Sequence, residues 1–432
     1  MTGRRAPGVV GSLALAALLF TACPGAQGRH EAGLRGAHIE VLAVWSGDEQ
    51  HRFEQVTAAF ERRTGVTVGY SSAGHGVAAE VDARIADDRL PDVAFLPQPG
   101  LLRRLAAEGR LVALDRATQD AVSRNYASVW RDLGSVADRL YGVWFKAANK
   151  SLLWYNVGVF ERAGAVPPDD ADRLVQVART LAATGVPAFA VGGGDAWTLT
   201  DWFENLYLRA AGPEKYDLLA AHRIAWTDES VKDTLRLLAR ILDPAVVAGG
   251  TDGAVRTSFE GSVETAFATP PGAAMVFEGD FVAGVVEART RARLGVDADV
   301  VAFPDVGGSP PGVVGGGDAA VLFRRSPAGD AFLHYLATPE AAAVWAGQGG
   351  FLSPNRNLDL SVYPDEISRS MARRLLDAGD EFRFDLSDLQ PSAFGASATQ
   401  GLRPALQDFL RTRDVDATAT RLEAAARAAF GG

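Results

Sequence analysis

Apolar and polar residues in the first part of the chain alternate between a strand-like and a helix-like period. The predicted elements are, in chain order, a strand over 39–45, a helix that contains Phe53, Val56 and Phe60 and stops at Gly65, a strand over 66–70, a helix over 79–86, a strand over 93–96 and a helix over 101–108. Strands and helices in this alternation predict a parallel α/β lobe, with a binding crevice at the carboxyl ends of its strands.

The segment 141–156 breaks this pattern, because it holds mostly extended-type residues without helical spacing. It is longer than one strand needs, so we expect it to cross between two lobes. Asp228 is a plausible N-cap, and Thr338-Pro339-Glu340 marks another helix start. The later elements expected from spacing are helices over 174–183, 202–211, 231–242, 366–378, 402–411 and 415–429, and strands over 273–277 and 300–303.

Length, composition and the N-terminal residues indicate the number of domains and the cellular compartment. A chain of 432 residues with 47% hydrophobic residues is long enough for two domains. Its single cysteine, Cys23, excludes an internal disulfide framework. Residues 1–22 carry Arg4 and Arg5, then an apolar run, and predict a signal peptide, and residues 23–37 predict a flexible tether. The ending Phe-Thr-Ala-Cys resembles a bacterial lipobox, in which the cysteine is acylated; the alternative is an ordinary secretory signal with an incidental cysteine.

Charge and motifs exclude several classes of function. The net charge of −10 opposes binding to nucleic acid or to an anionic membrane surface. The six histidines are scattered, and the chain lacks nucleophile-elbow, phosphate-loop and paired-cysteine motifs, so we expect no catalytic residue, metal or cofactor. The sequence neither predicts nor excludes a carboxylate pair for glycoside hydrolysis, because the separation of the two carboxylates is a three-dimensional property.

Seven blocks in a fixed order carry a resemblance to a known family. They are Val-Trp-Ser-Gly-Asp-Glu (44–49), Pro-Asp-Val-Ala-Phe-Leu-Pro-Gln-Pro-Gly (91–100), Lys-Ser-Leu-Leu-Trp-Tyr-Asn (150–156), Thr-Asp-Trp-Phe-Glu-Asn-Leu (200–206), Gly-Gly-Gly-Asp-Ala-Ala-Val (315–321), Tyr-Leu-Ala-Thr-Pro-Glu-Ala-Ala (335–342) and Gly-Gly-Phe-Leu-Ser-Pro-Asn (349–355). The chain resembles the extracellular solute-binding proteins of sugar-importing ABC transporters, the maltose-binding-protein-like group, and is similar to the α-glucoside-binding lipoproteins of Gram-positive bacteria.

The resemblance implies an α/β periplasmic-binding-protein-like fold, with two discontinuous α/β lobes joined by a hinge and a ligand cleft between them. It implies crossings near 146–149, 300–303 and 318–324. Lobe 1 would comprise 38–147 plus 302–325, and lobe 2 would comprise 148–301 plus 326–432. The implied function is capture of a neutral sugar by hinge closure and delivery to ABC permease subunits. We expect an exported monomer, held on the outer face of the cytoplasmic membrane by its lipid anchor alone.

Candidate ligand-binding residues follow from what a neutral sugar needs: aromatic rings for its C–H faces, and carboxylates or amides for its hydroxyls. The candidates are Trp45, Asp48, Glu49, Gln98, Asn149, Trp197, Asp201, Trp202, Phe281, Asp318 and Phe351. Phe281 stands where members of the family carry a sugar-stacking aromatic residue. Structural roles compete: Trp45 can pack in the core, Ser46 and Glu49 can form a capping box, Asp201 can cap a helix that starts at residue 200 or 201, and Gly315–Gly317 can be a turn.

Other ligands and functions remain open from sequence. A polyol, an amino sugar or a sugar phosphate would fit the same family. A phosphate needs convergent basic residues, for which Lys146, Lys150 and Arg84 are the suggestive ones. An exported enzyme that acts on glycans and a receptor that signals without transport are the alternatives outside solute import.

Overall fold

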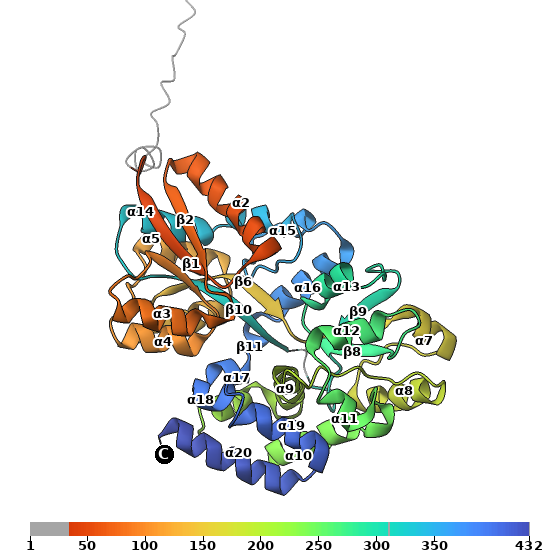
Figure 1. The fold of residues 1–432 in the computed structure, drawn as a ribbon. Coiled ribbons are helices and arrows are strands. Elements are labelled where there is room, and N and C mark those ends of the chain that lie inside the picture. The colour runs from red at the N-terminus through yellow and green to blue at the C-terminus, as the bar shows by residue number, and fades with distance from the viewer. Residues whose placement is uncertain (1–33, 310–311, 432) are drawn as a thin grey trace, which may run out of the picture.

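Two separate β-sheets organise the chain (Figure 1). The computed structural model describes residues 34–309 and 312–431. The large sheet has the order β11-β10-β3-β1-β2, with β6 paired to β10, and the second sheet has the order β8-β7-β9. The strands of the large sheet are β1 (His38–Ala43), β2 (Thr67–Ser72), β3 (Val93–Leu96), β6 (Gly142–Asn149), β10 (Val313–Leu322) and β11 (Phe382–Phe384). Those of the second are β7 (Leu152–Asn156), β8 (Met275–Glu278) and β9 (Ala298–Ala302).

The predicted N-terminal α/β order is confirmed. β1 pairs in parallel with both β2 and β3, and helix α2 (Gly47–Thr64) ends at Gly65, whose φ of 75° is the left-handed conformation expected of a C-terminal glycine. The predicted capping box at its start is wrong. Ser46 is the N-cap residue but makes no side-chain cap bond, and the Glu49 carboxylate pairs with the Lys146 ammonium.

Helices cover both faces of the large sheet (Figure 1). They are α2, α3 (Val77–Ala86), α4 (Pro99–Ala107), α5 (Arg116–Asn125), α6 (Ser128–Leu133), α14 (Pro327–Leu336), α15 (Pro339–Ala346) and α16 (Glu366–Asp377), with a small hairpin of β4 (Ser135–Val136) and β5 (Arg139–Leu140). The sequence assigns 326–432 to lobe 2, but α14 contacts β1 and β10, α15 contacts α2, and β11 pairs with β10. This part of the assignment is wrong, since the apolar faces of α14 and α15 are buried on the first sheet.

Strand β10 is the centre of the large sheet. Its residues pair with β6 along one edge and with β3 and β11 along the other, so Gly315–Gly317 lie inside a strand rather than in a turn. A side chain at Gly315 would collide with the Ala148 carbonyl and would come within 2.7 Å of the Phe382 ring. The glycines are needed because neighbouring strands approach closely. The chain stays in one sheet along the whole of β10, so the predicted crossing near 318–324 is wrong.

The second lobe surrounds the long helix α9 (Trp197–Ala220), which is interrupted at Gly212. Its other helices are α7 (Val157–Ala163), α8 (Ala171–Ala183), α10 (Glu229–Ile241), α11 (Gly250–Ala254), α12 (Phe259–Phe267), α13 (Val282–Arg289), α17 (Leu386–Leu389), α18 (Ser392–Gly395), α19 (Leu402–Thr412) and α20 (Val415–Phe430). Asp228 caps α10, as predicted, by accepting a hydrogen bond from the Ser230 N–H. The predicted start of α9 at residue 200 or 201 is wrong, so Asp201 lies inside the helix rather than at its cap.

Three crossings between the lobes meet at one place. The chain leaves β6 for β7 at Lys150 and Ser151, returns to the first lobe between the end of β9 at Ala302 and the start of β10 at Val313, and enters the second lobe again at Asp385. Lys150 N donates to the Val314 carbonyl at 2.9 Å, Val314 N donates to Ser151 Oγ at 2.9 Å, and Asp385 N donates to the Gly315 carbonyl at 2.9 Å. These bonds tie the crossings into a single hinge region.

The predicted signal peptide 1–22 and Cys23 lie outside the described residues. Across the described ranges, every helix is either too short or too polar to cross a membrane.

Candidate functional site

One group of candidate side chains lies on the first lobe beside the hinge. Lys146 on β6 faces Asp318 on β10 in the strand register and forms an ion pair with Glu49 on α2. Burial raises the pKa of Asp318 to about 6, against the opposing effect of the Lys146 charge. Burial favours the neutral form of Lys146, but the Glu49 and Asp318 carboxylates outweigh it and raise the pKa of the ammonium. The structure thus brings two of the predicted residues, Glu49 and Asp318, to one cation.

A second group, on the second lobe, is aromatic. Trp197 begins α9 and is half-buried, and its ring centroid lies 5.3 Å from that of Phe259 and 5.9 Å from that of Phe281. The Lys150 ammonium lies 5.4 Å from the Trp197 centroid, a cation–π distance. Trp197 and Phe281, both predicted from sequence, are therefore neighbours, and both are partly open to solvent.

Carboxylates surround the Lys150 ammonium. Nζ lies 3.2 Å from Asp201 Oδ2 and 2.5 Å from Asp385 Oδ2, and the Asp201 and Asp385 side chains are each 1% exposed. The Glu278 carboxyl group is also 1% exposed, its two oxygens accept no hydrogen bond from the described residues, and the charge of Asp201 acts on it. We call Lys150, Asp201, Glu204, Glu278 and Asp385 the hinge carboxylate cluster.

Burial shifts the ionisation of this cluster. It raises the pKa of Asp201 to about 7, although the Lys150 charge opposes the shift. Burial, reinforced by neighbouring carboxylates, raises the pKa of Glu204 and of Glu278 well above the usual value. The pKa of Lys150 is raised well above its usual value because Asp201 and Asp385 outweigh the burial that favours the neutral amine. Four buried carboxyl groups around one ammonium cannot all be ionised at low cost.

Two reciprocal hydrogen bonds join the end of β6 to the second lobe. Asn149 N donates to Asp280 Oδ1 at 2.7 Å, and Asp280 N donates to the Asn149 carbonyl at 3.0 Å. Burial raises the pKa of Asp280 to about 6, and the carboxylate also interacts with the charge of Lys146 on the first lobe. Asn149, predicted as a solute contact, is 1% exposed, and its side-chain oxygen accepts from the Ser151 N–H at 3.0 Å. It therefore shapes the crossing.

The cluster offers oxygen atoms that could hold a metal ion. One oxygen each of Asp201, Glu204 and Asp385 lies within 4.8 Å of the other two. The Lys150 ammonium already pairs with Asp201 and Asp385, so the chain itself supplies the positive charge that an ion would bring. The arrangement fits a lysine–carboxylate cluster better than a metal centre.

Three predicted aromatic contacts lie in the core in this structure. Trp45 is 1% exposed, with the ring centroids of Phe53, Phe95 and Trp345 within 4.8 Å, and Phe351 stacks on Trp345 at 5.1 Å. Trp202 is likewise enclosed by three phenylalanine rings, the nearest at 4.5 Å. Each of these rings is packed on several sides in this structure, so their role as solute contacts stays a prediction.

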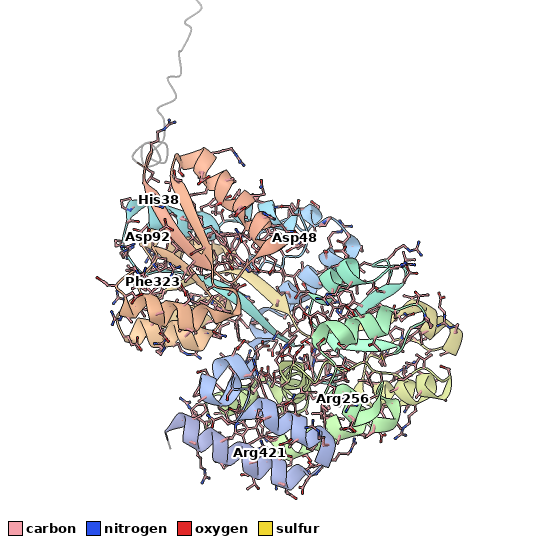
Figure 2. The ribbon with its side chains drawn as sticks, in the orientation of Figure 1. His38, Asp48, Asp92, Arg256, Phe323 and Arg421 are labelled. Carbon is pink, nitrogen blue, oxygen red and sulfur yellow. The ribbon has the colours of Figure 1, made fainter. Side chains whose placement is uncertain are left out.

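Two predicted polar contacts are accessible. Asp48 is exposed in the first turn of α2, and Figure 2 places it on the side of the first lobe that is turned toward the second. Gln98 follows β3 as the N-cap residue of α4, and its side chain is partly exposed and makes no cap bond.

Sequence reasoning considered Lys150 only as a contact for a phosphate, and it missed Glu204, Glu278 and Asp385 as members of the hinge carboxylate cluster. A signal existed for Lys150: the chain has only four lysines, and two of them, Lys146 and Lys150, fall in the crossing segment. Both are neutralised by carboxylates, and Arg84 pairs with Glu80 at 2.7 Å. An anionic solute therefore finds no free cation among these three residues.

A surface hollow of about 840 Å³ lies elsewhere, between α7, α8 and the loop at 305–308. None of the candidate residues lines it, and its side chains are mostly polar and exposed. The hinge region, where aromatic rings and carboxylates converge, is the better candidate for a solute site.

Comparisons with known proteins bear on the family and the fold of the chain. The family model of bacterial extracellular solute-binding proteins matches residues 46–343. The chain is 32% identical to the osmoprotective compounds-binding protein of Synechocystis sp. over 89% of this chain and 91% of the relative. It is 33% identical to the α-glucosides-binding periplasmic protein of Rhizobium meliloti over 84% of this chain and 82% of the relative.

Solved structures share the fold. The bacterial solute receptor AcbH, described as having an exclusive preference for β-D-galactopyranose, superposes with a TM-score of 0.76 at 18% identity, over 91% of this chain and 98% of the receptor. The two-lobed α/β architecture expected from the sequence is thereby confirmed.

Proposed function

This chain belongs to the family of bacterial extracellular solute-binding proteins, and on that premise we propose that it captures a neutral sugar between its lobes and delivers it to an ABC importer. The proposed solute is an α-glucoside or a related oligosaccharide, and the receiving partner is the membrane permease of the importer. The relative named for α-glucosides is similar along most of both chains, which supports this class of solute.

The observation that carries the proposal is the half-buried Trp197 beside buried carboxylates at the hinge. A sugar ring needs an apolar face and several hydrogen-bonding partners at once. Trp197 and Phe281 offer the face, and the Asp48 carboxylate and the Gln98 amide are accessible hydrogen-bonding groups on the first lobe. Closure of the hinge would bring these two sets together around one solute.

The test is a calorimetric and thermal-shift panel on the mature protein. The panel contains maltose, trehalose, sucrose and maltodextrins, with sorbitol and mannitol added because one relative is named for osmoprotective compounds. A solute that binds the folded form raises its midpoint of unfolding by mass action. No heat and no shift with any member would overturn the sugar assignment.

Catalysis is tested with the same material. We expect no turnover of aryl glucosides, because the family members named above are binding proteins. Turnover that disappears in an Asp201→Asn variant would replace import with glycan hydrolysis.

We further propose export and anchoring through an acylated Cys23, after removal of residues 1–22. Mass spectrometry of the protein extracted from membranes should find lipid on an N-terminal Cys23. Cys23→Ser should release the protein from the membrane fraction; retention of that variant in membranes would contradict the anchor.

A further inference from the structure

Three of the seven sequence blocks meet at the hinge. They are the blocks over 150–156, 200–206 and 315–321, which hold the first crossing, part of α9 and most of β10. Trp197, the first residue of α9, belongs to the proposed solute site, whereas Glu204 and Asn205, about two turns further along the helix, are buried. Their polar atoms bond to other parts of the chain, and those parts are the crossings between the lobes.

Ser151 joins the first crossing to both ends of the second. The Phe303 N–H group, just after β9, donates to the Ser151 carbonyl at 2.9 Å, and the Val314 N–H group, in β10, donates to Ser151 Oγ at 2.9 Å. The hydroxyl group in turn donates to Asn205 Oδ1 at 2.6 Å. Because Ser151 is buried, its hydroxyl group both accepts and donates inside the protein, and α9 holds the first two crossings through it.

Asn205 and Glu204 tie α9 to the first and third crossings directly. Asn205 Nδ2 donates to the Lys150 carbonyl and to the Asp201 carbonyl, each at 3.0 Å, so one bond holds the first crossing and the other fixes the side chain along its own helix. Glu204 accepts the two backbone N–H groups at the start of α17, just after the third crossing. All three crossings are thus bonded, directly or through Ser151, to two adjacent residues of one helix.

We propose that Asn205 is a positioning residue which, through Ser151, makes α9 and the three crossings move as one hinge body, so that a solute held on Trp197 draws the lobes together. The hinge body consists of α9 with 150–151, Phe303, Val314 and 385–387. A helix is a rigid element, so a displacement of its first turn reaches the residues at which the crossings are bonded. The link to solute rests on the proposed function, whereas the hinge body itself does not.

Hydrogen exchange tests the hinge body without any solute. Asn205→Ala takes no hydrogen bond away from a backbone N–H group, because the side-chain amide bonds only to two carbonyls and to a hydroxyl group. We nevertheless expect exchange at least about fivefold faster at amides of all three crossings, because the opening of a cooperative unit exposes its amides together. These amides are those of Lys150, Phe303, Val314, Asp385, Leu386 and Ser387. Faster exchange at Lys150 alone, or at none of them, would overturn the hinge body.

Thr234→Ala is the matched control for this measurement. Thr234 is fully buried, and its hydroxyl group donates to the Ser230 carbonyl at 2.9 Å within α10. The variant loses a buried hydrogen bond inside one helix, so the amides of the crossings should exchange as in the native protein. Equal acceleration in the two variants would trace the exchange to global unfolding and would overturn the proposal. Ser151→Ala gives the same readout at the third crossing if Asn205→Ala does not fold.

Small-angle X-ray scattering tests the link to solute capture. At saturation, the panel sugar that binds should lower the radius of gyration of the native protein, and it should lower that of Asn205→Ala by less. A full contraction in this variant, or no contraction in the native protein, would overturn the link. If no panel member gives heat, the proposed function fails, while hydrogen exchange still decides whether α9 and the crossings form one body.

Discussion

Glu204 shows how one side chain holds two parts of the second lobe together. It is fully buried on α9, and its two oxygens accept hydrogen bonds from Leu386 N at 2.9 Å and Ser387 N at 3.0 Å, at the start of α17. The carboxyl group therefore fixes the chain just after the third crossing.

We predict that Glu204→Ala destabilises the protein by about 1–3 kcal/mol for each N–H left without a partner. Urea unfolding measures the effect, and Glu287→Ala on the exposed face of α13 is the control, for which we expect a change within about 0.5 kcal/mol. Equal midpoints for the two variants would show that water replaces the carboxylate at no cost.

Trp197 is the residue on which solute affinity should depend most. We predict that Trp197→Ala weakens binding of the panel sugar at least about tenfold, or about 1.4 kcal/mol, because the exposed aromatic face is lost. Trp226→Phe removes an indole that is fully buried against Phe203 and Phe394, and its affinity should stay unchanged. Isothermal calorimetry compares the two, and a Trp197→Ala variant with native affinity would move the site elsewhere.

At the residue scale, the sequence proposed Asp48 and Gln98 from the ends of strands and Trp197 from its place near a glycine-rich loop, and all three stay predicted solute contacts. It did not predict Glu278 or Asp385, because these residues join the cluster only when segments far apart in the chain meet. The sequence also could not decide whether Trp45 packs in the core or contacts solute. The burial of its ring depends on partners from distant segments, which the local pattern does not contain.

At the element scale, β10 depends on residues without side chains. Gly315 faces the Ala148 carbonyl and the Phe382 ring, whereas a side chain at Gly316 would meet only Asp385 Oδ2, at an ordinary 3.7 Å. We predict that Gly315→Ala destabilises the protein by about 3 kcal/mol or more through overpacking, while Gly316→Ala costs about 1 kcal/mol or less. Thermal unfolding of the pair checks this, and similar midpoints would mean that the strands can separate freely.

Elements with a strong period were predicted well, and β3 was predicted with the same bounds as observed, 93–96. β10 was missed because three consecutive glycines erase the alternation on which a strand prediction depends. The pairing of β11 with β10, and hence the true third crossing at Asp385, has no local signature at all.

At the scale of the whole molecule, buried carboxyl groups set the dependence of stability on pH. Burial raises the pKa of Asp280, Asp318 and Asp388 to about 6 and that of Asp201 to about 7, so the native state holds protons that the unfolded chain has lost. Their stabilising contribution is complete below about pH 4 and is lost as pH rises through these values.

We therefore predict that the free energy of unfolding decreases between about pH 5 and pH 7, by about 1.4 kcal/mol per pH unit for each proton retained. Urea unfolding at several pH values measures the slope, and Asp318→Asn should make it shallower. A stability that rises over this interval would show that these carboxyl groups are ionised in the native protein.

The central position of β10 also governs the order in which the molecule can be completed during synthesis. Until residue 322 has been made, β3 and β6 present open edges, and α9 lacks the cover of α17 and α19 until residue 412. Neither lobe can finish as an independent early domain, so nascent chains stay incomplete until almost the last residues emerge. Removal of the C-terminal helices would consequently strip the second lobe of its core rather than trim a dispensable tail.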